Sequence, residues 1–316
     1  MNLINPELHS ITAFAPATCS NLAVGFDILG LAFDQAGDSV TLTKRNDNKL
    51  VIESIASKEN LPFDNNKNTA TVALQALLTQ LDLEQGFSIH IDKGISLSSG
   101  MGGSAASAVA ALVACNAFLK KPLSLLELAQ YALVGEQAAS GQKHADNIAP
   151  CLFGGLTLIT ALDPLEIFPL PIPELICVLI HPHLQIATKE ARKILKDKLP
   201  LVDYVKQAAQ LAGFIASLYE KNWGLMQKSF TDLLIEPQRA AFVPGFYQIK
   251  QAALNAGALG FSFSGSGPSL LALAKDETSA TTIADAIQHH LQKEKLASDC
   301  WIAPISRQGA RVTQIK

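Results

Sequence analysis

A glycine-serine turn in the sequence leads directly into an alanine-rich segment: residues 94–119 read GISLSSGMGGSAASAVAALVACNAFL. The glycines of the turn have no side chain, so its backbone can approach a ligand closely. The helix predicted after the turn directs its free N–H groups and the positive end of its dipole back toward it. This combination favours phosphate binding. The candidate nucleotide-binding residues here are Ser98, Ser99, Gly100, Met101, Gly102, Gly103, Ser104 and Ala105.

Two familiar phosphate motifs do not describe this turn. A Walker A loop requires a lysine directly after its glycines, whereas Lys93 precedes the turn and the next lysine is Lys120. The spacing Gly100-x-Gly102-x-x-Ala105 fits the loose dinucleotide pattern, but that pattern continues into a strand that ends in an acidic residue. Here a second predicted helix follows instead. On this segment alone, a tight turn without any ligand stays open as the alternative.

Other polar residues have the chemistry to bind a metal ion or a zwitterion. Glu136, on a predicted helix, offers an oxygen ligand of the kind that Mg²⁺ prefers. Arg192 and Arg239 carry guanidinium groups that match a carboxylate, and Asn21 and Asp27 offer acceptors to an ammonium group. Each has a plain alternative: an exposed helix glutamate, surface arginines in weak ion pairs, and Asx turns.

The periodicity of the sequence predicts the elements that position these residues. Alternating apolar and polar residues predict strands at 11–17, 38–44 and 87–91, and residues 50–55 form another strand. The glycine turn therefore follows a strand and opens a helix. Asn68 and Thr69 are both candidate N-caps for the helix TVALQALLTQL.

The mixture of helices and strands predicts an α+β fold with two domains. Four prolines between Asp163 and Pro173 suit a connection between domains. The predicted division is an N-terminal domain of residues 1–165, which carries the phosphate loop, and a C-terminal domain of residues 166–316.

Composition excludes several classes of protein. Of the 316 residues 48% are hydrophobic, enough for a substantial core. The net charge is −3 and no basic stripe with interleaved aromatic residues occurs, which argues against a nucleic-acid partner. The five cysteines form no C-x-x-C pair, as expected of reduced thiols in a cytoplasmic protein. Glycines and prolines interrupt the long uncharged stretches, which argues against membrane spans, and no signal peptide is recognised.

Five further features occur in order along the chain. They are PATCSNLAVGFDILGLAF, GMGGSAAS, GEQAASGQKHADNIAPCLFGGL, the pair TKEAR and IEPQR, and GFSFSGSGPSLLAL. Together they resemble the homoserine kinases, within the GHMP family of small-molecule kinases that also includes galactokinase and mevalonate kinase. The resemblance covers about Ile11 to Ala274. One departure is Gly103, where the family loop Gly-Leu-Gly-Ser-Ser has its first serine.

The resemblance implies a role for each candidate residue. Ser104 and Glu136 would hold Mg²⁺ between the β- and γ-phosphates of ATP, and Asn68 would contact the nucleotide. Arg192 and Arg239 would bind the substrate carboxylate. Asn21, Asp27, His144 and Asp146 would contact the rest of the substrate. Asp146 or Asn147 would lie close to the reacting hydroxyl without a true general base, while Lys143 and the helix dipole stabilise charge.

The resemblance also implies the fold and the reaction. The N-terminal half would be like domain 2 of ribosomal protein S5, with a left-handed βαβ unit before the loop, and the C-terminal half would be ferredoxin-like. The expected reaction is ATP-dependent phosphorylation of the side-chain hydroxyl of L-homoserine in threonine biosynthesis, by a cytoplasmic homodimer. The alternatives are a sister kinase that acts on mevalonate or shikimate, and a ligand sensor on the same fold without catalysis.

Overall fold

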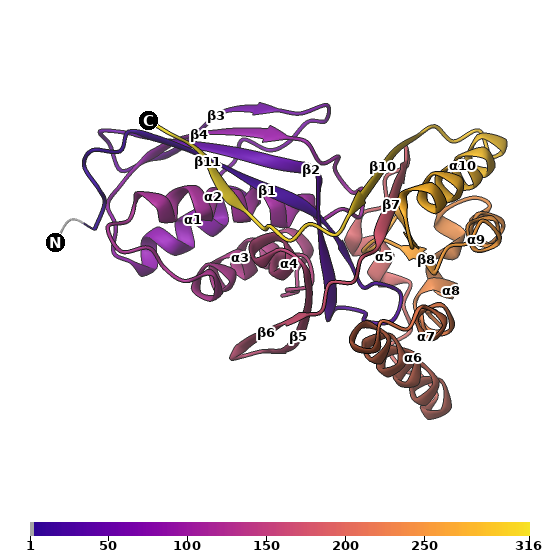
Figure 1. The fold of residues 1–316 in the computed structure, drawn as a ribbon. Coiled ribbons are helices and arrows are strands. Elements are labelled where there is room, and N and C mark those ends of the chain that lie inside the picture. Colours follow the sequence, from indigo (N-terminus) through magenta and orange to yellow (C-terminus); the bar gives the residue numbers. More distant parts are fainter. Residues whose placement is uncertain (1–2) are drawn as a thin grey trace.

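The computed structural model describes residues 3–316, except the side chains of residues 139 and 140, and contains two β-sheets with helices packed against them (Figure 1). The first sheet has the strand order β11-β1-β2-β4-β3, and β5 and β6 join it where β5 pairs with β2. Its strands are β1 (Ser10–Ser20), β2 (Leu29–Lys44), β3 (Leu50–Ala56), β4 (Phe87–Lys93), β5 (Leu156–Leu162), β6 (Leu165–Leu170) and β11 (Arg311–Ile315).

Four helices cover one face of the first sheet (Figure 1): α1 (Thr69–Gln80), α2 (Gly103–Phe118), α3 (Leu125–Ser140) and α4 (Ile148–Phe153). The central helix α2 is buried along most of its length between the sheet, α1 and α3. Its alanines and serines make this possible, because small side chains let helices approach closely. As predicted, Asn68 is the N-cap of α1, and its side chain accepts the N–H of Ala70 at 3.1 Å.

The second sheet is antiparallel, with the order β10-β7-β9-β8. Its strands are β7 (Ile176–Pro182), β8 (Gly260–Phe263), β9 (Leu270–Ala274) and β10 (Ser298–Pro304). The helices α9 (Phe246–Asn255) and α10 (Glu277–Lys293) pack on it around a second apolar core. The remaining helices are α5 (Thr188–Lys193), α6 (Leu201–Glu220), α7 (Trp223–Ser229), α8 (Glu236–Arg239) and a 3₁₀ turn at Ala240–Phe242.

The phosphate loop connects the first sheet to α2. Parallel strands β3 and β4, joined by α1, form a βαβ unit. The chain leaves β4 at Lys93, passes through the glycine-serine turn and enters α2 at Gly103. The turn therefore lies between a strand and a helix, as the sequence predicts.

The proline-rich segment 163–173 is more than a connection. It contains β6, which pairs antiparallel with β5 and has Pro169 in an edge strand, where proline is tolerated. The last strand, β11, returns to pair with β1. The division of the chain at residue 165 stays a prediction. The chain passes from the first sheet to the second between β6 and β7, and it returns to the first sheet with the C-terminal strand β11.

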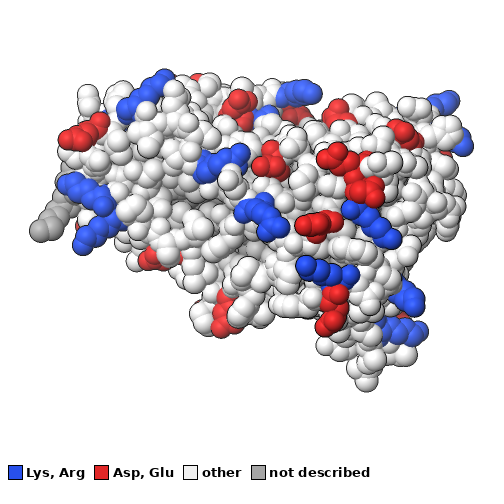
Figure 2. All heavy atoms as spheres, viewed as in Figure 1, with Lys and Arg blue, Asp and Glu red and all other residues white. Residues whose placement is uncertain are grey.

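The surface mixes charges of both signs. On the face in Figure 2, lysines and arginines alternate with aspartates and glutamates over both halves. Among residues 3–316, no helix combines the length and the apolar composition that a membrane crossing requires.

Candidate active site

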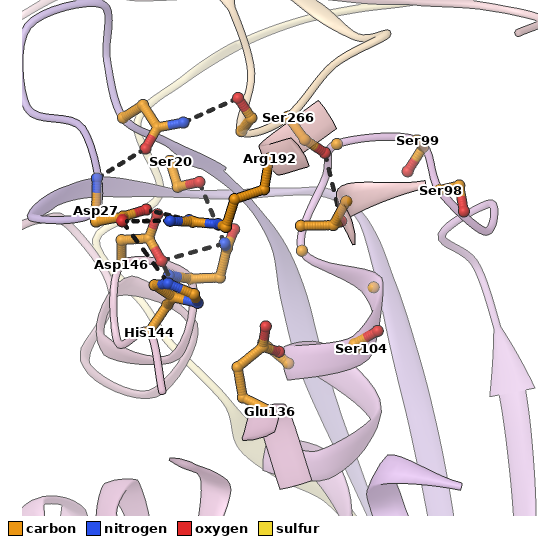
Figure 3. Close-up of a pocket in the computed structure, with 18 of the residues that line it drawn as sticks. Ser20, Asp27, Ser98, Ser99, Ser104, Glu136, His144, Asp146, Arg192 and Ser266 are labelled. Carbon is orange, nitrogen blue, oxygen red and sulfur yellow. Dashed lines mark hydrogen bonds and ion pairs between the residues drawn. The ribbon is translucent and has the colours of Figure 1, made fainter. Parts of the chain in front are cut away.

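One pocket brings together most of the residues singled out in the sequence (Figure 3). In this central pocket the loop after β4 faces the β1–β2 connection, the start of α4, and residues of α5, α8 and the β8–β9 turn. Its lining is Ser20, Asn21, Phe26, Asp27, residues 96–100 and 102–105, Glu136, His144, Asp146, Asn147, Thr188, Arg192, Arg239, Gly265 and Ser266. Both sheets thus contribute to a single site.

The loop is held in place through its carbonyl groups. The carbonyls of residues 98–101 accept hydrogen bonds, in order, from Ile186 N–H (3.3 Å), Ser269 N–H (3.0 Å), the Ser264 hydroxyl (2.8 Å) and Thr18 N–H (3.1 Å). In the described part of the chain, no backbone N–H of residues 98–105 donates to a protein acceptor. A row of N–H groups is therefore left for a ligand, which suits an anion.

Backbone torsions of the loop repeat with a period of two residues. φ is positive at Ser98 (54°), Gly100 (79°) and Gly102 (71°). Alternation of left- and right-handed residues forms concave groups of N–H donors that bind anions. A Cβ at Gly100 would lie 2.4 Å from the Ser264 carbonyl oxygen, and one at Gly102 would lie 2.0 Å from Thr18 Oγ1. Only glycine fits at these two positions.

The β1–β2 connection is strained and tightly hydrogen-bonded. Asn21, Leu22, Ala23 and Asp27 all have positive φ, which is uncommon for residues with a side chain and typical of functional sites. The Asn21 amide donates to the Gly265 carbonyl at 2.8 Å and accepts the Asp27 N–H at 3.0 Å. Asn21 therefore orients Asp27 and links it to the second half of the chain.

Asp27 and Arg192 form a bidentate ion pair. The Arg192 guanidinium donates to the two carboxylate oxygens at 2.7 and 2.9 Å. His144 Nε2 lies 3.7 Å from the same carboxylate. Burial lowers the pKa of His144, against the opposing effect of Asp27, so His144 is neutral at pH 7.

Arg239 carries a buried charge without a carboxylate partner among the described residues. The residue is 3% exposed, and its guanidinium donates to the carbonyls of Ala191 and Gly265, both at 3.2 Å. Burial and the nearby Arg192 lower its pKa to about 10, so the group stays protonated at pH 7. The Phe26 ring centre lies 5.4 Å from Arg239 Cζ and 5.1 Å from Arg192 Cζ. Phe26 thus packs against both cations.

Asp146 and Asn147 lie at the floor of the pocket. Asp146 is 4% exposed, and burial, with the nearby Asp27, raises its pKa from 3.8 to about 6. The Asn147 amide accepts from Thr18 Oγ1 at 2.7 Å and donates to Ser20 Oγ at 3.1 Å. Asn147 is therefore already engaged in supporting the strand beside the loop, whereas Asp146 keeps acceptor capacity.

Oxygen donors lie at the lower side of the loop. Figure 3 shows Glu136 extending from α3 into the space below Arg192, with Ser104 on the neighbouring first turn of α2. Ser99 is buried, and its hydroxyl has no hydrogen-bond partner in the described structure. Within residues 3–316, no group of three His, Cys, Asp or Glu side chains could hold a metal.

Two predicted residues lie outside the central pocket, and one lies beside it. Lys143 is exposed and does not line the pocket. The Met101 side chain is buried behind the loop, although its carbonyl helps to anchor it. Asn68 lines a neighbouring pocket that shares Leu97, Gly103 and Ser104 with the central one.

Sequence patterns missed several residues of the site. Phe26 was part of a recognised segment, but nothing in the sequence indicates that it packs against two arginines. Ser20 lines the pocket, and Thr18 holds the Met101 carbonyl and the Asn147 amide, only because β1 runs beside the loop. Lys93, set aside because it precedes the glycines, donates to the Gly103 carbonyl.

The family of the chain follows from its similarity to known proteins. Residues 68–155 match the GHMP kinases N terminal domain, and residues 214–293 match the GHMP kinases C terminal family. A homoserine kinase of Chloroherpeton thalassium is 42% identical over 96% of this chain and 100% of its own length. A homoserine kinase of Xylella fastidiosa is 43% identical over 97% of this chain and 95% of its own length. The chain belongs to the homoserine kinase family of the GHMP kinases.

Solved structures agree with this assignment. The crystal structure of homoserine kinase from Cytophaga hutchinsonii matches with a TM-score of 0.94 at 40% identity, over 98% of this chain and 99% of that one. The crystal structure of L. major mevalonate kinase in complex with R-mevalonate has a TM-score of 0.72 at 15% identity, over 96% of this chain and 99% of that one. This similarity shows a common fold. The expected two-domain GHMP-kinase fold is confirmed, and kinase membership makes ATP the co-substrate.

The contact of Gly102 with Thr18 predicts a large effect of a single methyl group. Gly102→Ala should destabilise the fold by about 3 kcal/mol or more, since it adds a clash to an unfavourable φ. Gly141→Ala is the matched control: its φ is 84°, but nothing lies within 4 Å of the added Cβ, so about 1 kcal/mol is expected. Urea unfolding measures both. Equal losses would contradict the predicted contact.

The raised pKa of Asp146 predicts a pH-dependent effect on stability. The fold favours the protonated carboxyl, so its contribution is fully present below pH 3.8 and is lost as the pH rises through about 6. Asp146→Asn should therefore stabilise the protein at pH 8 by up to about 3 kcal/mol and have little effect at pH 4. Urea unfolding at both pH values tests this. The same change in stability at both would show that the pKa is not raised.

Proposed function

We propose that the protein transfers the γ-phosphoryl group of ATP to the side-chain hydroxyl of L-homoserine, giving O-phospho-L-homoserine and ADP, as a step of threonine biosynthesis. The observation that carries the proposal is the division of charge in the central pocket. On one side a row of backbone N–H groups suits a polyphosphate. On the other, a buried cation and a carboxylate suit an amino acid.

The two arginines differ in whether a protein carboxylate already occupies the guanidinium group. Asp27 occupies the fork of Arg192, whereas Arg239 is paired only with two carbonyl oxygens. We therefore assign the substrate carboxylate first to Arg239, with Arg192 beside it, and the α-ammonium to Asp27. Charge-assisted hydrogen bonds contribute about 1.5–3 kcal/mol each. Asn21 acts by orienting Asp27. Neutral His144, which lies beside the Asp27 carboxylate, also contacts the substrate.

The nucleotide spans two adjoining pockets in this account. Its phosphates lie on the N–H groups of residues 98–105 in the central pocket. The nucleoside lies in the neighbouring pocket beside Asn68, because Leu97, Gly103 and Ser104 line both. Ser99 lines the central pocket, so its buried, unpartnered hydroxyl would gain a partner from the phosphates.

Glu136 and the Ser104 hydroxyl fit Mg²⁺ as oxygen donors on the same side of the loop. Mg²⁺ takes one or two ligands from protein and the rest from phosphates and water. When bound, the ion would neutralise charge on the β- and γ-phosphates.

Catalysis in this account rests on positioning. In a loose transition state the hydroxyl oxygen bonds to the γ-phosphorus as the bond to the β–γ bridging oxygen breaks, and the hydroxyl proton passes to an oxygen of the transferred phosphoryl group. Alignment and charge neutralisation then supply most of the acceleration. Asp146 is the pocket residue best able to orient the hydroxyl, and Asn147 supports the strand beside it. We assign no catalytic role to Lys143, because its side chain is exposed and does not line the pocket. A kcat several decades lower in Asp146→Asn, at unchanged KM, would instead identify a general base.

The alternatives fit the pocket less well. Mevalonate and shikimate carry a carboxylate but no ammonium, so neither would use Asp27. A sensor would bind the same ligands without turnover.

Two expectations from the sequence stay proposals: a homodimer, which light scattering would test, and a cytoplasmic location.

The purified protein with Mg-ATP should release ADP in the presence of L-homoserine and not with mevalonate, shikimate or galactose. A coupled ADP assay measures this, and mass spectrometry identifies the phosphorylated product. Absence of homoserine-dependent ADP release would refute the proposal. Binding of homoserine without turnover would favour the sensor.

A variant ties the assay to the pocket. Arg239→Met keeps most of the side-chain volume and removes the cation, so the KM for homoserine should rise at least tenfold. The affinity for ADP should stay within about threefold of wild type. A variant with an unchanged KM for homoserine would show that the carboxylate binds elsewhere.

A further inference from the structure

A buried cluster of polar groups lies beneath the glycine-serine loop. Asp38 comes from β2, Lys93 from the end of β4 and Ser107 from α2, elements that run side by side in Figure 1. The side chain of Asp38 is 0% exposed and that of Lys93 is 4% exposed. None of the three, called the Lys93 cluster below, lines the central pocket, but Lys93 and Ser107 also line the neighbouring pocket beside Asn68.

The Lys93 ammonium connects this cluster to the loop. It donates to the Asp38 carboxylate, to the Ser107 hydroxyl at 3.0 Å and to the Gly103 carbonyl at 2.9 Å. Asp38 also accepts the Ser107 hydroxyl at 2.7 Å and the Ile95 N–H at 3.2 Å. Every ammonium proton has an acceptor, so the group has one defined position.

Electrostatics argue against a role in stabilising the helix. The N-terminus of a helix is the positive end of its dipole, where an ammonium group is unfavourable. Burying an ion pair also removes two charges from water, and the attraction between them repays this only with excellent geometry. Lys93 nevertheless lies at the first turn of α2. Fixing that turn relative to β2 and β4 accounts for the arrangement.

The missing side chain at Gly103 belongs to the same arrangement. A Cβ there would lie 3.3 Å from Lys93 Nζ and 3.1 Å from Ile95 Cγ2. These contacts are tighter than packed side chains normally make, so a side chain would press on the ammonium. Where the family loop has serine, this chain has a glycine with its carbonyl bound to Lys93.

We propose that Lys93 is a positioning residue for the nucleotide. Through the Gly103 carbonyl it fixes the first turn of α2, and with it the hydroxyl of Ser104 and the N–H groups that face the pocket. Asp38 and Ser107 hold the ammonium in place. The inference rests on the proposed function only in taking the loop as the phosphate site.

The test compares Lys93→Met with the double variant Asp38→Asn/Lys93→Met, using ADP affinity from calorimetry and Tm. The single variant leaves Asp38 buried and unpaired, so Tm should fall and ADP binding should weaken. The double variant removes both charges, so Tm should return to within a few degrees of wild type. ADP binding should stay at least tenfold weaker, and the KM for homoserine should change less than twofold.

Wild-type ADP affinity in a double variant with restored Tm would overturn the inference, because Lys93 would then only neutralise Asp38. Lys121→Met, an exposed lysine beyond the opposite end of α2, is the matched control and should change neither quantity.

If the double variant does not regain Tm, Gly103→Ala is the second probe. It keeps both charges and places a methyl group against the ammonium, so ADP binding should weaken at least threefold in the wild-type background and less than twofold in Lys93→Met. An equal effect in both backgrounds would overturn the inference. Failure of the wild-type protein to bind ADP would instead contradict the proposed function.

Discussion

The site depends on the way the fold binds the carbonyl side of residues 98–101. Four consecutive carbonyls are taken by donors from β1 and from the second half of the chain. The N–H groups of the loop then have no protein acceptor within the described residues, and their dipoles add to that of α2. Because Ser264 and Ser269 supply two of the donors, the loop takes this conformation only when both halves of the chain have assembled.

The charges of the pocket are arranged around this loop at a cost in stability. Arg239 is buried without a carboxylate partner in the described structure, and Asp146 is buried beside Asp27. Four residues of the β1–β2 connection have positive φ. Such features persist where surrounding structure fixes them, and they mark sites prepared for a ligand. A zwitterion with a polyphosphate beside it would neutralise much of this charge.

Local patterns in the sequence predicted the phosphate loop, the N-cap at Asn68 and the strands and helices around them, because these depend on neighbours along the chain. The sequence motifs indicated both arginines. Only the tertiary structure shows that Asp27 pairs with Arg192 while Arg239 donates to carbonyl groups. Lys93 was set aside on spacing, yet β4 brings its ammonium back under the loop. Strand β11 and the strand within the proline-rich segment were missed because pairing, not propensity, decides them.

We propose that the N–H groups of residues 98–105 hold the phosphates while Arg239 holds a carboxylate. A crystal structure with a non-hydrolysable ATP analogue and L-homoserine tests both parts at once. We expect phosphate oxygens within hydrogen-bond distance of these N–H groups, and the homoserine carboxylate on the Arg239 guanidinium with the homoserine hydroxyl directed at the γ-phosphorus. Phosphates bound away from the loop, or a carboxylate that does not touch Arg239, would contradict it.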